Sequence, residues 1–184
     1  MEFMLCSVLL AADEPSDWYF FASGYSETGE LSIDGIGEVV ETDAEIGLRI
    51  GVGKALNEKF DLEFEFGTNE FNYSTFTAVG DFSYTQYSAM IGYKIPVSES
   101  FTVVPKVGFG LTNWELDEFD VNIGRTVVSD NDVTAKFGIN AEYQIDESIT
   151  AHVGYRVENT AFEIFGIGGD FGSSGLTFGA SFSF

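Results

Sequence analysis

Residues 176–184 read LTFGASFSF, and this stretch carries the pattern that decides the fold. Every second residue is apolar, whereas the residues between them are Thr177, Gly179, Ser181 and Ser183. Successive side chains of a β-strand point to opposite faces of the sheet. The stretch therefore predicts a strand with one apolar face and one small, polar face.

The same alternation recurs in seven further segments of the chain. Together with the last segment, the expected strands lie near residues 17–25, 44–53, 60–67, 82–95, 101–112, 132–145, 149–158 and 174–184. Short turns are expected at 54–59, 96–100 and 146–148, and longer connections at 26–43, 68–81, 113–131 and 159–173. Because short and long connections alternate, we expect an up-and-down meander with all short turns and both termini at one end.

A weak internal repeat supports this meander. Similar strand–turn–strand segments begin at residues 46, 91 and 137. The period is that of a hairpin, so it indicates repeated hairpins and not a solenoid.

The two faces of the expected strands differ in bulk and charge. One face gathers large apolar residues, and the other gathers most glycines and ten charged or titratable residues. The latter are Arg49, Glu63, Glu65, Lys94, Lys106, Lys136, Glu142, His152, Arg156 and Glu158. The interior of an eight-stranded barrel is too narrow for the bulky set, so this set is expected to face hydrocarbon. A soluble two-layer sandwich with the bulky set inside is the alternative.

When the chain is folded about its short turns, charges of opposite sign face one another on the small face. The expected partners are Lys136 with Glu158, Glu142 with His152, and Arg49 with Glu63 and Glu65. Because buried ions are unfavourable unless they are paired, this matching predicts a salt-bridged, plugged lumen.

The chain of 184 residues carries 30 acidic and 8 basic residues, with a formal charge of −22. Nucleic acid is therefore excluded as a partner, and cations and basic proteins are favoured. Many acidic residues fall in two of the longer connections: Glu27, Glu30, Asp34, Glu38, Glu41 and Asp43 in the first, and Glu115, Asp117, Glu118, Asp120 and Asp130 in the third. Their spacing matches no EF-hand loop, so we expect a solvated acidic surface and no metal or cofactor site; weak bridging by divalent cations is the alternative.

Residues 1–12 resemble the end of a secretory signal, because an apolar run precedes small residues and an acidic stretch. We expect this segment to be a partial signal peptide and residues 13–184 to form one barrel domain. Lipid attachment at Cys6 is the alternative, although the residues before it are not the small ones that a lipoprotein signal requires.

The tail resembles the carboxy-terminal assembly signal of bacterial outer-membrane barrels through Thr177, Gly179, Phe182 and Phe184. With the eight strands, residues 17–184 resemble the eight-stranded outer-membrane protein A and X family. The resemblance implies a monomer in the outer membrane of a Gram-negative bacterium. It would be inserted by the barrel-assembly machinery, contact lipid and lipopolysaccharide, and expose its long loops to ions or host proteins. Phe60, Tyr93, Phe101 and Tyr143 would form part of an aromatic girdle.

This family implies no single activity. We expect a non-enzymatic role in envelope structure or surface adhesion, with a narrow solute channel as the alternative. A lipid-modifying enzyme is the third possibility. The chain has a single histidine, His152, and the lipid A deacylase family places its serine two residues later, where this chain has Gly154. We therefore expect no catalytic site.

Overall fold

The computed structural model describes residues 17–33, 37–41, 45–74, 78–120, 124–164 and 167–184. Its elements are β1 (Trp18–Ile33), β2 (Gly37–Glu41), β3 (Glu45–Ala55), β4 (Phe60–Ser74), β5 (Ala78–Tyr93), β6 (Ile95–Pro96), β7 (Phe101–Asp120), β8 (Gly124–Gln144), β9 (Ile149–Ile164) and β10 (Ile167–Ser183). No helix in the described ranges is long and apolar enough to cross a membrane.

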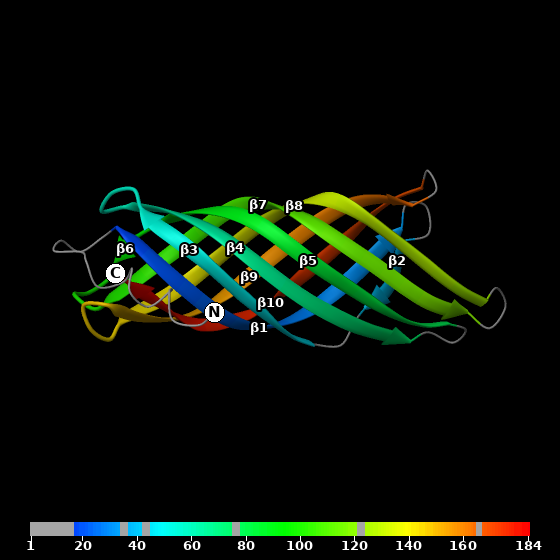
Figure 1. The fold of residues 1–184 in the computed structure, drawn as a ribbon, viewed down its shortest axis with the longest axis horizontal. Coiled ribbons are helices and arrows are strands. Elements are labelled where there is room, and N and C mark those ends of the chain that lie inside the picture. Colours follow the sequence, from blue (N-terminus) through cyan, green and yellow to red (C-terminus); the bar gives the residue numbers. More distant parts are fainter. Residues whose placement is uncertain (1–16, 34–36, 42–44, 75–77, 121–123, 165–166) are drawn as a thin grey trace, which may run out of the picture.

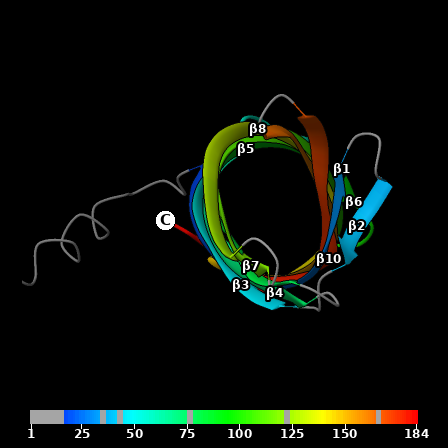
Figure 2. The same cartoon turned by 90° about the vertical axis from the view of Figure 1, so that its right-hand side faces the viewer.

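Eight long strands among these residues form one closed antiparallel barrel (Figure 1). Each long strand pairs with its neighbours in the chain, and β10 pairs with β1 from Ser183 opposite Tyr19 to Gly169 opposite Ile33. This closure confirms the expected fold class. The two short strands lie outside the ring order: β6 pairs with β7, and β2 pairs with the far part of β1. Figure 2 shows β2 standing off the ring.

The expected short turns are confirmed, and all lie at one end of the barrel. Asn57 and Asp146 stabilise two of them, because the Oδ1 atom of each accepts two backbone N–H groups within its turn. At the same end, the backbone N–H of Phe184 donates to the carbonyl of Trp18 at 3.4 Å. The first and last strands therefore meet beside the turns.

The outer surface carries a continuous belt of large apolar side chains. Phe109 is 65% exposed and Phe137 is 59% exposed, although both are strand residues in the middle of the wall. Neighbouring strands contribute registered rows such as Phe66, Tyr87, Leu111 and Val133. The orientation expected from the sequence, with the bulky set outside, is thus confirmed.

Aromatic residues edge this belt at the turn end. Phe60 lies opposite Tyr93 with ring centroids 5.1 Å apart, and Phe101 lies opposite Tyr143 in the register of β7 and β8. Their positions are those expected for a girdle at a membrane interface.

The strands are longer than the sequence pattern predicted, and the expectation of four long loops is wrong. β1 continues to Ile33, β4 to Ser74 and β7 to Asp120, while β8 already begins at Gly124. Most residues of the expected connections 68–81, 113–131 and 159–173 therefore belong to the wall. They form a projecting half of the barrel, beyond the apolar belt and away from the turns.

A shift in the phase of the apolar pattern explains this error. Along β4, Phe66 points outward in the belt, but Phe71 points inward and is fully buried. Along β7, Leu111 points outward and Trp114 inward. The alternation thus continues, but the apolar residues move from the outward-facing to the inward-facing positions. Because the sequence interpretation followed apolar residues on one face only, it assigned a loop where they change face.

Candidate functional site: the filled lumen

The centre of the lumen contains six buried charged groups that neutralise one another. We call them the central ion network: Arg49, Lys136, Arg156, Glu27, Glu65 and Glu158. Each side chain is at most 9% exposed. With equal numbers of cations and carboxylates, the network satisfies the condition under which buried charges are tolerated.

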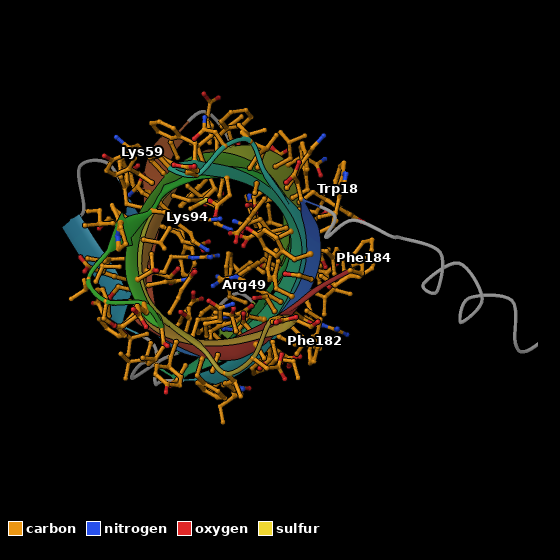
Figure 3. The ribbon with its side chains drawn as sticks, turned by 90° about the vertical axis from the view of Figure 1, so that its left-hand side faces the viewer. Trp18, Arg49, Lys59, Lys94, Phe182 and Phe184 are labelled. Carbon is orange, nitrogen blue, oxygen red and sulfur yellow. The ribbon has the colours of Figure 1, made fainter. Side chains whose placement is uncertain are left out.

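Arg49 on β3 bridges two carboxylates from strands far apart in the chain, Glu27 on β1 and Glu158 on β9. Its Nη2 atom donates to Glu27 Oε1 and to Glu158 Oε1, both at 2.7 Å. The guanidinium stacks on the Tyr25 ring at 3.8 Å from the centroid, and Tyr84 donates to the second oxygen of Glu27 at 2.9 Å. Figure 3 shows Arg49 pointing into the lumen.

Glu65 is the second centre of the network. Its Oε1 atom accepts hydrogen bonds from Lys136 and, at 2.7 Å, from Arg156. Lys136 also donates to Gln86 and Ser88, and lies 3.3 Å from Glu158. Four strands on opposite sides of the wall are thus connected through one buried cation.

A second group of charges lies nearer the turns. Lys106 donates to Glu63 at 2.7 Å and lies 3.7 Å from Glu142, while Lys94 lies 3.4 Å from Asp61. These side chains line a polar cavity of about 110 Å³ below the central ion network. This cavity is the open part of the lumen at the turn end.

A row of hydroxyl groups covers the other side of the network. Thr112 and Thr134 are 2.5 Å apart, Thr134 and Thr160 are 2.6 Å apart, and Gln86 donates to Thr112 at 2.9 Å. Thr134 is fully buried. The row crosses three adjacent strands, β7, β8 and β9.

Above the hydroxyls, an aromatic layer fills the lumen of the projecting half. It consists of Phe71, Phe82, Tyr84, Trp114, Phe162 and Phe171, with Leu116 and Val128 packed against it. Phe82 and Phe171 have ring centroids 4.4 Å apart, and Trp114 donates to Asp132 at 2.7 Å. The sequence interpretation missed this layer because Phe71, Trp114, Phe162 and Phe171 fell in the expected loops, whereas Phe82 and Tyr84 fell in the expected strand 82–95 on the face assigned to small and charged residues.

All ten residues proposed for the lumen from the sequence point inward, but their partners only partly match. Lys136 and Glu158 are registered opposite each other, as expected. Arg49, however, contacts Glu27 and Glu158, and not Glu63 or Glu65. The expected pairing was wrong because it considered only the two strands joined by each short turn. Glu27 lies on the other neighbour of β3, which is β1, and Glu158 reaches Arg49 from β9 across the narrow barrel.

His152 has a different partner from the one expected. It lies opposite Glu142 in the register, but its Nε2 atom is 2.8 Å from Ser23 Oγ on β1. Glu142 instead lies near Lys106. Ser23 was missed because the sequence interpretation looked for a serine beside His152 in the chain. No carboxylate of the described residues is hydrogen-bonded to the other ring nitrogen.

The tail residues line both faces of β10. Thr177 points inward, and a Cβ on Gly179 would lie 2.1 Å from the Ala22 carbonyl oxygen, so only glycine fits there. Phe182 faces outward, and Phe184 stacks on Phe20 at 5.0 Å (Figure 3). The tail therefore completes the wall where the barrel closes.

The expected acidic loops are divided between two environments. Glu27 is buried in the central ion network, whereas Glu30, Glu115 and Asp130 are exposed on the projecting half. Asp34 and Asp43 lie outside the described residues, and the side chains of Glu38, Glu41, Glu118 and Asp120 are not described. Within the described part of the chain, no group of three His, Cys, Asp or Glu residues could hold a metal ion.

The projecting half has one basic residue, Arg125. Its Nε and Nη2 atoms donate to the two oxygens of Asp117 at 2.9 and 2.5 Å. This hydrogen bonding lowers the pKa of Asp117 and raises that of Arg125. The rest of the projecting wall is left with an excess of negative charge.

Comparison with known proteins agrees with this architecture. The family model described as "Outer membrane protein beta-barrel domain" matches residues 3–184. The fold is similar to Neisserial surface protein A, at 13% identity and a TM-score of 0.64, over 94% of this chain and 100% of that chain. No curated protein sequence matches the chain.

Two further solved structures show how varied such barrels are. The attachment invasion locus protein Ail of Yersinia pestis is similar at 12% identity and a TM-score of 0.53, over 92% of this chain and 99% of that chain. The outer membrane protease OmpT of Escherichia coli is similar at 10% identity and a TM-score of 0.54, over 96% and 99%. At these identities the likeness shows the fold alone.

Proposed function

Because the chain belongs to the outer membrane protein β-barrel family, we propose that it is a closed barrel that serves envelope structure or contacts at the cell surface. The protein lies in the outer membrane, as its family and its structural neighbours do. The proposal concerns what the barrel does there.

The single observation that supports closure is the succession of filled layers in the lumen. The central ion network, the hydroxyl row and the aromatic layer follow one another along the axis, and the ion network links β1, β3, β4, β8 and β9. An ion on its way through would have to break buried ion pairs and then pass an apolar layer, and both steps are unfavourable.

Planar-bilayer recording on refolded protein tests this proposal. We expect no steady conductance steps from the natural chain. A variant carrying Lys136→Ala, Trp114→Ala and Phe82→Ala should conduct, because it removes one cation and two rings from the lumen. Stable conductance steps of defined size from the natural chain would instead show that it is a narrow channel.

The geometry also favours a non-enzymatic role. A serine nucleophile needs a histidine base that a third group orients. Ser23 and His152 meet, but Lys106 and Glu63 lie nearby in a cavity of about 110 Å³, which is small for a lipid chain. Hydrolysis of phospholipid or lipid A by the natural chain, lost in Ser23→Ala, would contradict this proposal.

We further propose that Thr177, Gly179, Phe182 and Phe184 act as the signal read by the barrel-assembly machinery. The support is their place at the closing seam, beside Phe20 on β1. Phe184→Ala should slow insertion into vesicles that contain the machinery, with little effect on spontaneous insertion into detergent. Equal slowing in both settings would instead point to a packing role.

A further inference from the structure

The outer wall changes its chemistry at the border between the apolar belt and the projecting half. On four strands, the belt includes the registered row of Phe66, Tyr87, Leu111 and Val133. Two residues further toward the projecting half, the next outward row consists of neutral polar side chains, which are Thr68, Thr85, Asn113 and Asn131. Because β4, β5, β7 and β8 lie side by side, this row forms a continuous polar edge along the belt (Figure 1).

The wall is hollowed at this polar edge. A hollow of about 490 Å³ is lined by six neutral polar residues, which are Thr68, Ser83, Thr85, Asn113, Ser129 and Asn131. Its other lining residues are Glu115, Asp130, Tyr84 and Trp114, so the lining contains carboxylates but no Lys or Arg. Sites for small organic ligands occupy roughly 300–1,000 Å³, and the hollow falls in this range.

The polar side chains of the hollow can bind a ligand without giving up other contacts. Asn113 and Asn131 are registered opposite each other, and both are exposed. Within the described part of the chain, neither side-chain amide is hydrogen-bonded to another residue. Amide and hydroxyl side chains both donate and accept hydrogen bonds, and sugar hydroxyls require partners of this kind.

The position of the hollow favours a lipid as its occupant. A molecule whose acyl chains lie against Leu111 has its head group beside Asn113, two residues further along β7. Tyr87 is 56% exposed at the border of the belt and packs on Phe66, with ring centroids 5.3 Å apart. Tyrosines in such positions mark the head-group level of a membrane. The hollow therefore begins where lipid head groups lie.

The charges at the hollow decide between classes of head group. Phosphate groups are bound by Arg and Lys, which the lining lacks. Glu115 and Asp130 repel phosphate, and Arg125 on the projecting half is already hydrogen-bonded to Asp117. An uncharged sugar meets the neutral amide and hydroxyl groups without this repulsion.

We propose that the hollow binds the uncharged sugar rings of a glycolipid head group in the outer leaflet of the membrane. The inference rests on the proposed envelope role and names a lipid class and a site for it. Asn113 and Asn131 exchange hydrogen bonds with the sugar hydroxyls, and the hydroxyls of Thr85 and Ser129 add to them. The acyl chains continue along the apolar belt past Tyr87.

NMR on refolded protein in phosphatidylcholine nanodiscs tests this proposal, with EDTA present so that divalent cations cannot bridge phosphates to carboxylates. Dephosphorylated lipid A, whose head group is an uncharged disaccharide, should shift the backbone amide signals of Thr85 and Ser129 saturably. Phosphatidylglycerol at the same mole fraction should leave them unchanged. No shift, equal shifts with phosphatidylglycerol, or shifts only with phosphorylated lipid A would overturn sugar recognition. Equal shifts with soluble N-acetylglucosamine at the same concentration would overturn the lipid as occupant.

A matched pair of variants separates the hollow from the rest of the outer wall. The double variant Asn113→Ala, Asn131→Ala should raise the mole fraction of glycolipid at half-saturation at least about fivefold, because two side-chain amides are lost. Asn159→Ala should leave it unchanged, because Asn159 is an equally exposed amide on β9 and lies outside the hollow. Urea unfolding checks that both variants fold as the natural chain does.

Equal weakening in both variants would overturn the site. Bilayer recording on the same proteins tests lumen closure independently of lipid binding, so the two proposals fail separately.

Discussion

The belt half and the projecting half of the barrel use the same strands with opposite orientations of their apolar residues. In the belt, Phe66 and Phe137 point outward while Lys136 and Glu65 are buried. In the projecting half, Phe71 and Trp114 are buried while Glu70 and Glu115 face out. The difference teaches that the alternation of apolar and polar residues indicates a strand. Which face carries the apolar residues indicates whether hydrocarbon or water surrounds that part of the wall. Hydrocarbon requires apolar groups outside, and water allows them inside.

The largest expected effect concerns the buried ions of the belt half. Lys136→Met should lower the free energy of unfolding by about 3–5 kcal/mol, because it leaves Glu65 and Glu158 short of one cation. Urea unfolding in lipid vesicles measures this. Adding Glu65→Gln should recover part of the loss; a double variant less stable than the sum of both single losses would mean that the ions are not coupled as the contacts indicate.

The next effect separates the two outer surfaces on one strand. Phe137→Arg should cost about 2–4 kcal/mol, because it places a cation on the belt of β8. Asn131→Arg, on the same face of β8 in the projecting half, should change stability little. The same unfolding experiment compares them. Similar costs for both would show that the boundary of the belt is placed wrongly.

A smaller effect separates two phenylalanines of β4. Phe71 contacts Phe82, Tyr84 and Phe171, so Phe71→Leu should cost about 1–2 kcal/mol. Phe66→Leu should cost less, because Phe66 lies on the outer face and an apolar side chain remains against lipid. Hydrogen exchange should locate the loss for Phe71→Leu in the projecting half. Faster exchange spread evenly over the belt would count against two distinct halves.

The smallest effect is electrostatic and lies on the projecting surface. In Arg125→Gln the pKa of Asp117 should rise toward its ordinary value, because the neutral amide no longer stabilises the carboxylate. Since the folded-state pKa is lowered, the interaction is present above the ordinary pKa of aspartate and is lost as the pH falls through the lowered value. An NMR titration of the Asp117 carboxyl measures the shift; an unchanged value would exclude Arg125 as its cause. No measurable change in stability is expected.

Much of the candidate site was predictable, since residues on the same parity of regular strands must share a face. The ten lumen residues follow from that rule alone. The sequence did not predict Glu27 and Ser23 as lumen residues, because each was interpreted from its neighbours in the chain. Glu27 stands there among the acidic residues of an expected loop.

The sequence by itself determined the alternation, the short turns, the number of long strands and, in the belt half, the contents of each face. These depend on the period of two along a strand and on local turn chemistry. Only the tertiary structure decided that Arg49 meets Glu158, 109 residues away, and that His152 meets Ser23. Closing a narrow wall brings opposite strands within the reach of one side chain, and no local pattern records which of them will meet.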